Sequence, residues 1–332
     1  MRAATLRAYA APPAVEERPD PLPAESEDVV LVAVTGAPIT PLDVLCSTGT
    51  SYFGPPPLPY VPGVQGVGVV RSGPEELRGR RVWFPTTAGM HPGDGSLAQL
   101  CAADVADVVA LPDGVDDALA AALGLSAVAA WEVLTSRASL AHGEQVVVLG
   151  AGGTVGQVAV QAARLLGARR VVAVCRPGAG TERATRAGAD AVVRLHRDEE
   201  VTELAERLRV ECDGPVDVVV DPVAGVPGSA AAVLLGPGGR LVNLGSSAGP
   251  SLSVDSATLR SRSAAVLGYT NTSLSPGRRA ATLGTVLRHA ADGELTVDHV
   301  TVPLEDVTTA WADVAAGVAT ARVVVRPSAS AG

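Results

Sequence analysis

Lysine is absent from this chain of 332 residues. Without an ε-amino group the protein cannot form a Schiff base with a substrate or a cofactor. The tyrosine–lysine pair of one class of reductases and the lysine of a phosphate-binding loop are excluded for the same reason. Any phosphate that the protein binds must therefore meet arginine or backbone N–H groups.

Cysteine and aromatic residues are also scarce. The four cysteines, at positions 46, 101, 175 and 212, show no paired spacing, which favours reduced, buried thiols over a disulfide framework. Aromatic residues make up 3% of the chain, so any wide pocket is expected to have aliphatic walls. A bulky or carrier-bound substrate is an alternative that this composition leaves open.

Concentrated positive charge and long apolar runs are missing as well. The formal net charge is −9 and the arginines are scattered, which disfavours binding to nucleic acid or to an anionic membrane surface. No uninterrupted apolar run reaches the ~18 residues of a membrane-spanning helix. Arg7 interrupts what would be the apolar part of a signal peptide. A cytoplasmic protein is therefore expected.

The residues that are present suffice for two domains. Hydrophobic residues make up 47% and charged residues 18% of the chain, as in a globular protein longer than one ordinary core. Residues 1–118, with short apolar runs split by proline and glycine, predict a β-rich domain. Residues 119–272 predict an α/β domain, and residues 273–332 a return to the first domain.

Residues 146–156 carry the main motif. Apolar residues at 146–149 predict a buried strand, and a helix over 154–166 follows a glycine-rich turn. Dinucleotide phosphates bind at such helix N-termini, where backbone N–H groups lack partners and small residues let the backbone approach. The predicted phosphate-binding residues are Ala151, Gly153, Thr154, Val155 and Gly156.

The elements after this motif alternate between strands and helices. Such alternation predicts a parallel sheet with right-handed crossovers. A purely structural turn is the simpler interpretation of the glycines, but this context favours dinucleotide binding. The predicted strands are 170–175, 191–193, 216–220, 240–244, 265–269, 300–303 and 322–325. The predicted helices are 116–134, a short helix through Thr185 that Gly188 ends, 198–210, 278–289 and 304–317.

In their order, the motifs resemble the medium-chain dehydrogenase/reductase superfamily, in its zinc-independent quinone oxidoreductase-like branch. The resemblance covers nearly the whole chain and rests on segments 30–34, 39–43, 62–68, 149–160, 221–225, 243–245 and 303–306. It implies a GroES-like catalytic domain, formed by the N- and C-terminal parts, and a Rossmann nucleotide-binding domain. It also implies an active site in the cleft between these domains, and a homodimer formed by sheet edges near residues 265–270.

Zinc enzymes of the sister branch place cysteine and histidine ligands in two loops where this chain holds Thr40 and Val64. A hydroxyl and an aliphatic side chain cannot replace thiolate or imidazole. A four-cysteine lobe is missing from residues 79–101, and the five histidines are dispersed. We therefore expect no metal. The substrate must then be electrophilic already, such as a quinone or an α,β-unsaturated carbonyl, whose developing enolate needs only hydrogen bonds.

The end of the strand 170–175 predicts the cofactor. An NAD enzyme usually has an acidic residue about 20 residues beyond the fingerprint, whereas this chain has Cys175 followed by Arg176. A guanidinium can bind a 2′-phosphate through two hydrogen bonds, and Thr181 or Arg183 could add contacts. We expect NADP(H), with a solvated loop charge as the alternative for Arg176.

Further cofactor contacts are implied by the resemblance. It places Asn243, Gly245, Gly268 and Tyr269 near the ribose and nicotinamide, and it matches Ser126 to a threonine beside the nicotinamide. Turn chemistry is the alternative for the first four, with glycine supplying a positive φ and asparagine a local backbone bond.

The candidates for substrate contact lie in or beside the loops that replace the zinc site, and they are Thr40, Asp43, Tyr52, Phe53 and Gln65. The Tyr52 phenol could bond the substrate oxygen or deliver a proton, and Thr40 could donate to it. Packing alone is the alternative for Tyr52. Asp43 could instead fix the loop through backbone N–H groups. Many relatives carry asparagine where Thr40 stands.

Together these residues predict an NADPH-dependent reductase that transfers hydride to a quinone, an enone or an enoyl ester. Water, Tyr52 or Thr40 would supply the proton. An enoyl-thioester reductase of a biosynthetic pathway is the first alternative. An NADPH-binding regulatory protein without turnover is the second, because loss of activity leaves the fold and the fingerprint intact.

Overall fold

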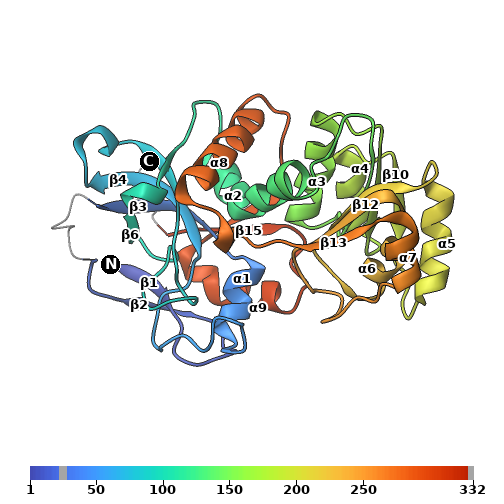
Figure 1. Cartoon of the computed structure of the whole chain (residues 1–332). Helices are drawn as coiled ribbons and strands as arrows, with labels where there is room; N and C mark the ends of the chain where they lie inside the picture. Colours follow the sequence, from blue (N-terminus) through green and yellow to red (C-terminus); the bar gives the residue numbers. More distant parts are fainter. Residues whose placement is uncertain (22–27, 328–332) are drawn as a thin grey trace. The chain divides into compact units, whose positions relative to one another are not determined.

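A computed structural model describes residues 1–21 and 28–327 and divides the chain into two units (Figure 1). Unit 1 contains Met1–Leu125, Ser275–Asp292 and Val297–Gly332, and unit 2 contains Ser126–Leu274 and Gly293–Thr296. The α/β unit 2 is thus inserted into unit 1, which is formed by the N-terminal and C-terminal parts of the chain. Residues 119–125, which the sequence assigned to the second domain, lie in unit 1, and the helix that contains them is kinked at Gly124, next to the unit boundary.

Unit 1 is built on a mixed, largely antiparallel sheet of order β14-β15-β3-β4-β5-β7, with β6 also paired to β3. Buried side chains of β3 share one core with Leu6, Phe84 and Leu97. The predicted β-rich character of this part is therefore confirmed. The strands are β1 (Arg2–Thr5), β2 (Ala14–Glu17), β3 (Val29–Pro38), β4 (Gln65–Ser72), β5 (Arg81–Pro85), β6 (Leu100–Asp104), β7 (Val109–Ala110), β14 (His299–Pro303) and β15 (Arg322–Arg326).

The α-helices that lie wholly in unit 1 are α1 (Pro41–Ser47), α8 (Pro276–Ala291) and α9 (Val307–Ala315). Helix α1 was not predicted. It begins at Thr40, whose side chain accepts from the Asp43 N–H while the Asp43 carboxylate accepts from the Thr40 N–H. The helix predicted over 304–317 is split into a 3₁₀ turn, Leu304–Asp306, and α9.

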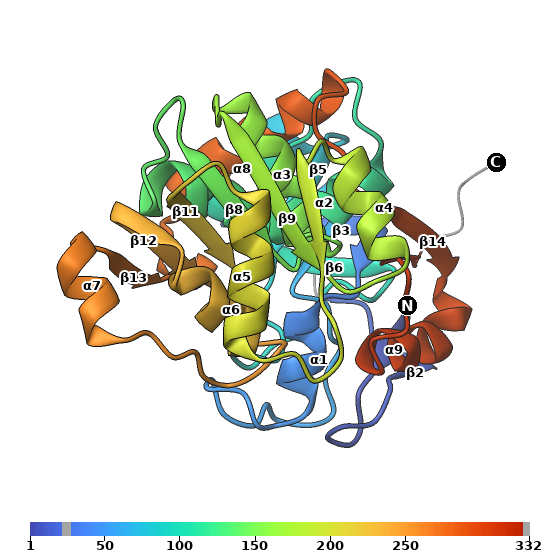
Figure 2. The ribbon, with the colours of Figure 1, turned by 90° about the vertical axis from the view of Figure 1, so that its right-hand side faces the viewer.

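Unit 2 is a doubly wound fold with a parallel sheet of order β10-β9-β8-β11-β12-β13, as predicted. Every residue of β8 is buried, as in a strand covered on both faces. Helix α3 contacts α4, and α5 contacts α6 (Figure 2). The elements are β8 (Gln145–Leu149), α3 (Thr154–Leu165), β9 (Arg170–Cys175), α4 (Ala179–Arg186), β10 (Ala191–Arg194), α5 (Val201–Glu211), β11 (Val216–Asp221), α6 (Gly225–Ala232), β12 (Leu235–Asn243), α7 (Ser256–Arg262) and β13 (Ala265–Gly268).

The strand order fixes where a ligand belongs. The chain leaves β8 toward β9 and β10 on one side, and β11 continues on the other side of β8. Ligands of such sheets bind at the carboxyl ends of the strands next to this switch point. The ends of β8, β9 and β11 are therefore the first places to examine.

Two helices of unit 2 were missed by the sequence prediction. Helix α6 begins at Gly225, which has a φ of 62°, and it contains Pro227 in its first turn. These residues resemble a loop, although proline is well tolerated in a first turn. Helix α7 is short and polar, and its start depends on the Asp255 side chain, which accepts from the Thr258 N–H.

Helix α2 (Asp117–Glu132) continues into a π-helical segment, Val133–Arg137, and connects the two units. Gly124 interrupts it with φ 31° and ψ −132°, outside the helical region. By length and composition Asp117–Arg137 could cross a membrane, but 72% of its most apolar window is buried inside the protein. A buried core helix meets the same criterion of length and composition.

Candidate cofactor and substrate sites

The turn between β8 and α3 requires glycine for steric reasons. A Cβ on Gly156 would lie 2.4 Å from the Ala151 Cα, and one on Gly152 would lie 2.6 Å from the Gly180 Cα. A Cβ on Gly153 would meet only the Gly150 oxygen at 3.4 Å. Gly153 is the N-cap of α3, and no side chain caps the helix there. The first-turn N–H groups, among them those of Thr154 and Val155, can therefore receive an anion.

The Gly152 carbonyl of this turn is bound from two helices. The Gln157 Nε2 donates to it at 3.3 Å, and the Arg183 Nε donates at 2.8 Å. The Arg183 Nε thus holds this turn, and the contact of Arg183 with a 2′-phosphate stays a prediction. Gln157 was missed, because a glutamine inside a helical pattern gives no sign of a contact with the preceding turn.

At the carboxyl end of β9, Cys175 is 2% exposed, and its Sγ lies 3.8 Å from the Thr181 Oγ1. Burial raises the pKa of the Cys175 thiol, against the contact with Thr181 and the positive charges of Arg183 and Arg194. Arg176 is exposed, and within the described part of the chain it makes no hydrogen bond or ion pair. The predicted residues Cys175 and Thr181 thus meet at this strand end, and Arg176 follows it in the chain.

The ends of β11 and β12 are joined by Asp221, a residue that the sequence analysis missed. Asp221 is fully buried, and its Oδ1 accepts from the N–H groups of Val223 and Ala224 at 3.0 and 2.7 Å. The Asn243 Nδ2 donates to the Asp221 Oδ2 at 2.9 Å and to the Gly245 carbonyl at 2.8 Å. Asn243 thus makes the local backbone bond of the turn-chemistry alternative, and its contact with the cofactor stays a prediction.

The sequence suggested that glycine is needed at position 245 for a positive φ, but the structure gives another reason. A Cβ on Gly245 would lie 2.4 Å from the Pro222 oxygen, so a close approach and not a positive φ requires it. Gly268 has open space around it, and its carbonyl accepts from the Arg137 Nε at 2.9 Å. The Tyr269 hydroxyl donates to the Asn271 Oδ1 at 2.7 Å. Ser126 is half-buried in the part of α2 that follows the kink.

In unit 1, Asp43 connects the two loops that carry zinc ligands in the sister branch. The carboxylate is 2% exposed. Its Oδ1 accepts from the N–H groups of Gly63 and Val64 at 3.0 and 2.8 Å, and its Oδ2 accepts from the Thr40 N–H and Oγ1 at 2.8 and 2.6 Å. Burial raises the pKa of Asp43 against these hydrogen bonds. The loop-fixing alternative for Asp43 is therefore what the structure shows.

Gln65 continues this connection to the kink of α2. Its Oε1 accepts from the Leu125 N–H at 2.7 Å and from the Trp83 Nε1 at 3.1 Å. A Cβ on Gly124 would lie 2.0 Å from this same oxygen, so the kink needs glycine. The Gln65 side chain is 1% exposed, and within the described residues its Nε2 has no hydrogen-bond partner. Gln65 thus supports the kink from the side of the sheet.

The two predicted aromatic residues lie in a surface loop. Tyr52 is 76% exposed, its ring centroid is 4.3 Å from that of Phe53, and Phe53 in turn meets His91 edge-on at 6.5 Å. Tyr60 was missed. It is 4% exposed, its hydroxyl has no partner among the described residues, and burial raises its pKa strongly.

The donor groups at the place of the zinc ligands do not fit a zinc ion. The Thr40 hydroxyl is bonded to Asp43, and Val64 offers no donor atom. Over residues 1–21 and 28–327, no three side chains of His, Cys, Asp or Glu are grouped as a metal site requires. The four cysteines are free and buried, and burial raises the pKa of Cys46 to about 11.

Comparison with known proteins gives one matching family model, described as "Zinc-binding dehydrogenase", over residues 154–285. The quinone oxidoreductase of Sus scrofa is 30% identical over 229 residues, which are 68% of this chain and 67% of that protein. The solved structure of a mycobacterial quinone oxidoreductase superposes with a TM-score of 0.86 at 23% identity and covers 98% of this chain and 100% of its own.

A second kind of relative is much longer than this chain. One component of the phenolphthiocerol/phthiocerol polyketide synthase of Mycobacterium tuberculosis is 33% identical over 310 residues, which are 90% of this chain. The aligned region is only 13% of that synthase component. The chain therefore resembles one portion of a much larger protein.

Proposed function

Because this chain belongs to the quinone oxidoreductase-like branch of the medium-chain dehydrogenase/reductase superfamily, we propose that it is a zinc-independent, NADPH-dependent cytoplasmic reductase. Its proposed substrate is a quinone, an enone or an enoyl ester. One observation carries the cofactor part of this proposal. At the carboxyl end of β9, where an NAD enzyme holds a carboxylate, buried Cys175 is followed by the exposed guanidinium of Arg176, which is unpaired among the described residues.

Residues of unit 2 would bind the cofactor. The cradle formed by Gly152, Gly153 and Gly156 would admit the pyrophosphate to the N-terminus of α3. The end of β9 would receive the adenosine ribose, and Arg176 would bond its 2′-phosphate. When bound, NADPH supplies the hydride.

Residues of unit 1 would act on the substrate oxygen. Hydride addition to a conjugated carbonyl leaves negative charge on that oxygen, which must receive a hydrogen bond or a proton. The hydrogen of the Thr40 hydroxyl is directed to Asp43, whereas the Tyr52 hydroxyl has no partner among the described residues. Of the two predicted donors we therefore propose Tyr52, or a water molecule, and assign Thr40 to the loop.

The cofactor site is tested by Gly153→Val. The Cβ at this position has room in the turn itself, so the variant should fold, while its side chain blocks the approach of a pyrophosphate. Gly277→Val is the matched control, since Gly277 also lies in the first turn of a helix and has open space. We expect Gly153→Val to lose NADPH fluorescence enhancement and the control to keep it. NADPH binding that survives in Gly153→Val would refute the assigned site.

The reaction is tested by NADPH consumption with quinones, enones and enoyl thioesters, with and without a zinc chelator. Turnover on quinones or free enones that the chelator leaves unchanged is the expected result. Turnover on enoyl thioesters alone would select the second candidate, an enoyl-thioester reductase, which the likeness of 90% of the chain to part of a polyketide synthase favours. Tight NADPH binding without any turnover would instead identify a regulatory protein.

We also propose a homodimer formed through the edge strand β13. This strand ends the sheet order of unit 2, and its Val266 is 41% exposed, so its unpaired backbone groups can join a second copy. Light scattering of the wild-type protein should give twice the mass of the chain, and Val266→Pro should give the monomer, because proline removes an edge donor and adds steric bulk. A wild-type monomer would refute this proposal.

A further inference from the structure

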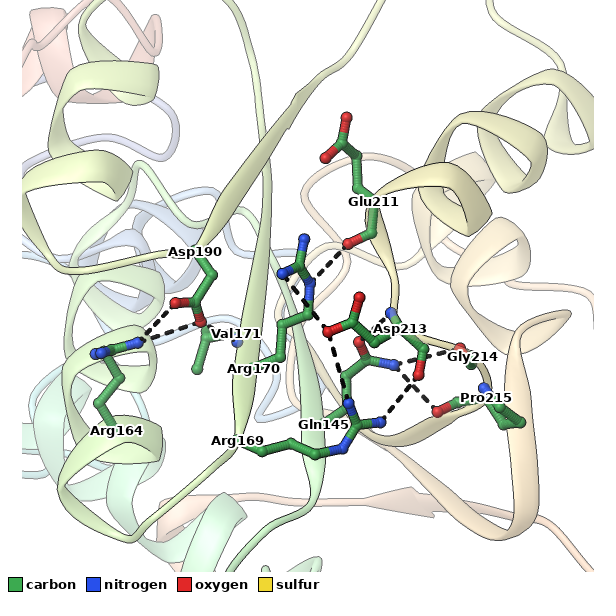
Figure 3. A network of polar contacts seen from close by, with 10 residues as sticks. All are labelled: Gln145, Arg164, Arg169, Arg170, Val171, Asp190, Glu211, Asp213, Gly214 and Pro215. Carbon is green, nitrogen blue, oxygen red and sulfur yellow. Dashed lines mark hydrogen bonds and ion pairs between the residues drawn. The ribbon is translucent and has the colours of Figure 1, made fainter.

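The arginines at the two ends of the parallel sheet in unit 2 differ in their partners. At the amino ends, Arg164 bonds both carboxylate oxygens of Asp190, and Arg169 and Arg170 pair with Asp213 (Figure 3). Gln145 is fully buried in the same network, with its side-chain oxygen and nitrogen both bonded. These arginines serve the fold, and no ligand is needed to account for them.

At the carboxyl ends the guanidinium groups are not satisfied in this way. Arg176 follows β9, and Arg194 is the last residue of β10. Both are exposed, and among the described residues neither side chain makes a hydrogen bond or an ion pair. Arg183 lies close by, but its Nε bonds the Gly152 carbonyl.

Strand register places Arg194 beside the predicted ribose site. β9 and β10 are parallel, and Arg194 is the direct partner of Cys175, so both side chains leave the same face of the sheet. Cys175 contacts Thr181 at the first turn of α4 on that face. The positive charge of Arg194 accordingly acts on the Cys175 thiol. Arg194 was not identified from the sequence. The residue that distinguishes NAD from NADP is expected at the end of β9, and Arg194 lies at the end of the next strand, β10.

We propose that Arg194 is a second selectivity residue, which together with Arg176 binds the 2′-phosphate of the cofactor from the neighbouring strand. Two guanidinium groups suit a dianion better than one, because each can form a charge-assisted pair of hydrogen bonds. Arg183 holds the neighbouring turn through its Nε. This inference rests on the proposed NADPH dependence and assigns a part of that selectivity to β10.

The test is a fluorescence titration of the full chain with NADPH and NADH, and a competition with 2′,5′-ADP and 5′-AMP. The variants are Arg194→Gln, Arg176→Gln and the double variant. Arg209→Gln is the matched control, because Arg209 is an exposed arginine of α5 with the same loss of charge. We expect Arg194→Gln to weaken NADPH and 2′,5′-ADP by about 10-fold or more, as for one charged hydrogen bond. NADH, 5′-AMP and the control should be unaffected.

The possible failures can be told apart. If Arg194→Gln binds NADPH like the wild type while Arg176→Gln does not, the role of Arg194 is wrong and NADPH dependence stands. If Arg194→Gln weakens NADH and NADPH equally, Arg194 acts on the fold and the inference is overturned. A wild-type protein that binds both cofactors equally, or neither, would overturn the proposed NADPH dependence and this inference with it.

Discussion

Replacing Asp43 tests how the loop at Thr40 and the loop at Gly63 and Val64 are fixed to each other. The carboxylate accepts hydrogen bonds from two loop N–H groups at Gly63 and Val64, and from the N–H and hydroxyl of Thr40. In Asp43→Asn one of the two oxygens becomes an NH₂ group. If that group faces Thr40, the hydroxyl can turn to accept from it. The Thr40 N–H can only donate, so it loses its acceptor and becomes an unpaired buried donor.

The magnitudes follow from this count of donors. A buried N–H without an acceptor costs about 1–3 kcal/mol, and removing a buried charge recovers part of its desolvation cost. We expect Asp43→Asn to lower the free energy of unfolding by about 1–2 kcal/mol. Asp43→Ala leaves all of the donors unpaired and should lower it by about 3–5 kcal/mol.

The measurement is urea unfolding followed by tryptophan fluorescence, which reports on unit 1 through Trp83 and Trp311. Asp113→Asn is the control, because this exposed carboxylate has no partner among the described residues. An Asp43→Ala variant within about 0.5 kcal/mol of wild type, the range of ordinary surface substitutions, would refute the structural role of Asp43.

Three further predictions concern the kink and unit 2. Gln65→Met leaves the Trp83 Nε1–H and the Leu125 N–H without their acceptor and should cost about 2–4 kcal/mol in urea unfolding; a change within about 0.5 kcal/mol would refute the role of these bonds. Gly124→Ala places a Cβ 2.0 Å from the Gln65 Oε1, so it should destabilise more than Ala at the open position Gly284; equal effects would refute the close contact. The hydrogen bond with Arg240 lowers the pKa of Glu144 from 4.5. The ionised Glu144 therefore stabilises the fold fully above about pH 4.5, and this contribution is lost as the pH falls through the lowered pKa. Glu144→Gln should flatten the acid side of a plot of unfolding free energy against pH. An unchanged plot would contradict this.

The nucleotide-binding unit could be predicted from the sequence in most of its parts. The strand predicted over 170–175 agrees with β9 at both ends, and the helix predicted over 154–166 ends one residue early. Alternating apolar runs and glycine stops are local signals, so they can be identified without knowing the fold. Helix α6 was missed because Gly225 and Pro227 are usually signs of a loop.

Site residues whose contacts are close in the sequence could be predicted, and those whose contacts are distant in the sequence could not. The need for glycine at 156 is local, because the Ala151 Cα that excludes a Cβ there lies five residues away, whereas Gly152 was missed because the Gly180 Cα that excludes a Cβ there belongs to α4. The sequence could not show that Arg183 bonds Gly152, that Asp221 joins two strand ends, or that Arg194 is the direct partner of Cys175. Each of these contacts depends on the pairing of distant segments. The types of the side chains predicted which chemical groups are available. Strand register determined which of these groups lie next to one another.

The two hydrogen bonds to the Gly152 carbonyl have a consequence for binding. Gln157 and Arg183 both restrain this turn through its Gly152 carbonyl, and a restrained loop has less conformational entropy to lose on association. That advantage depends on the pyrophosphate, which NADH and NADPH have in common. In the proposed binding mode the rigidity of the turn would contribute equally to the affinity for NADH and NADPH, and selectivity between them would depend on contacts at the ribose.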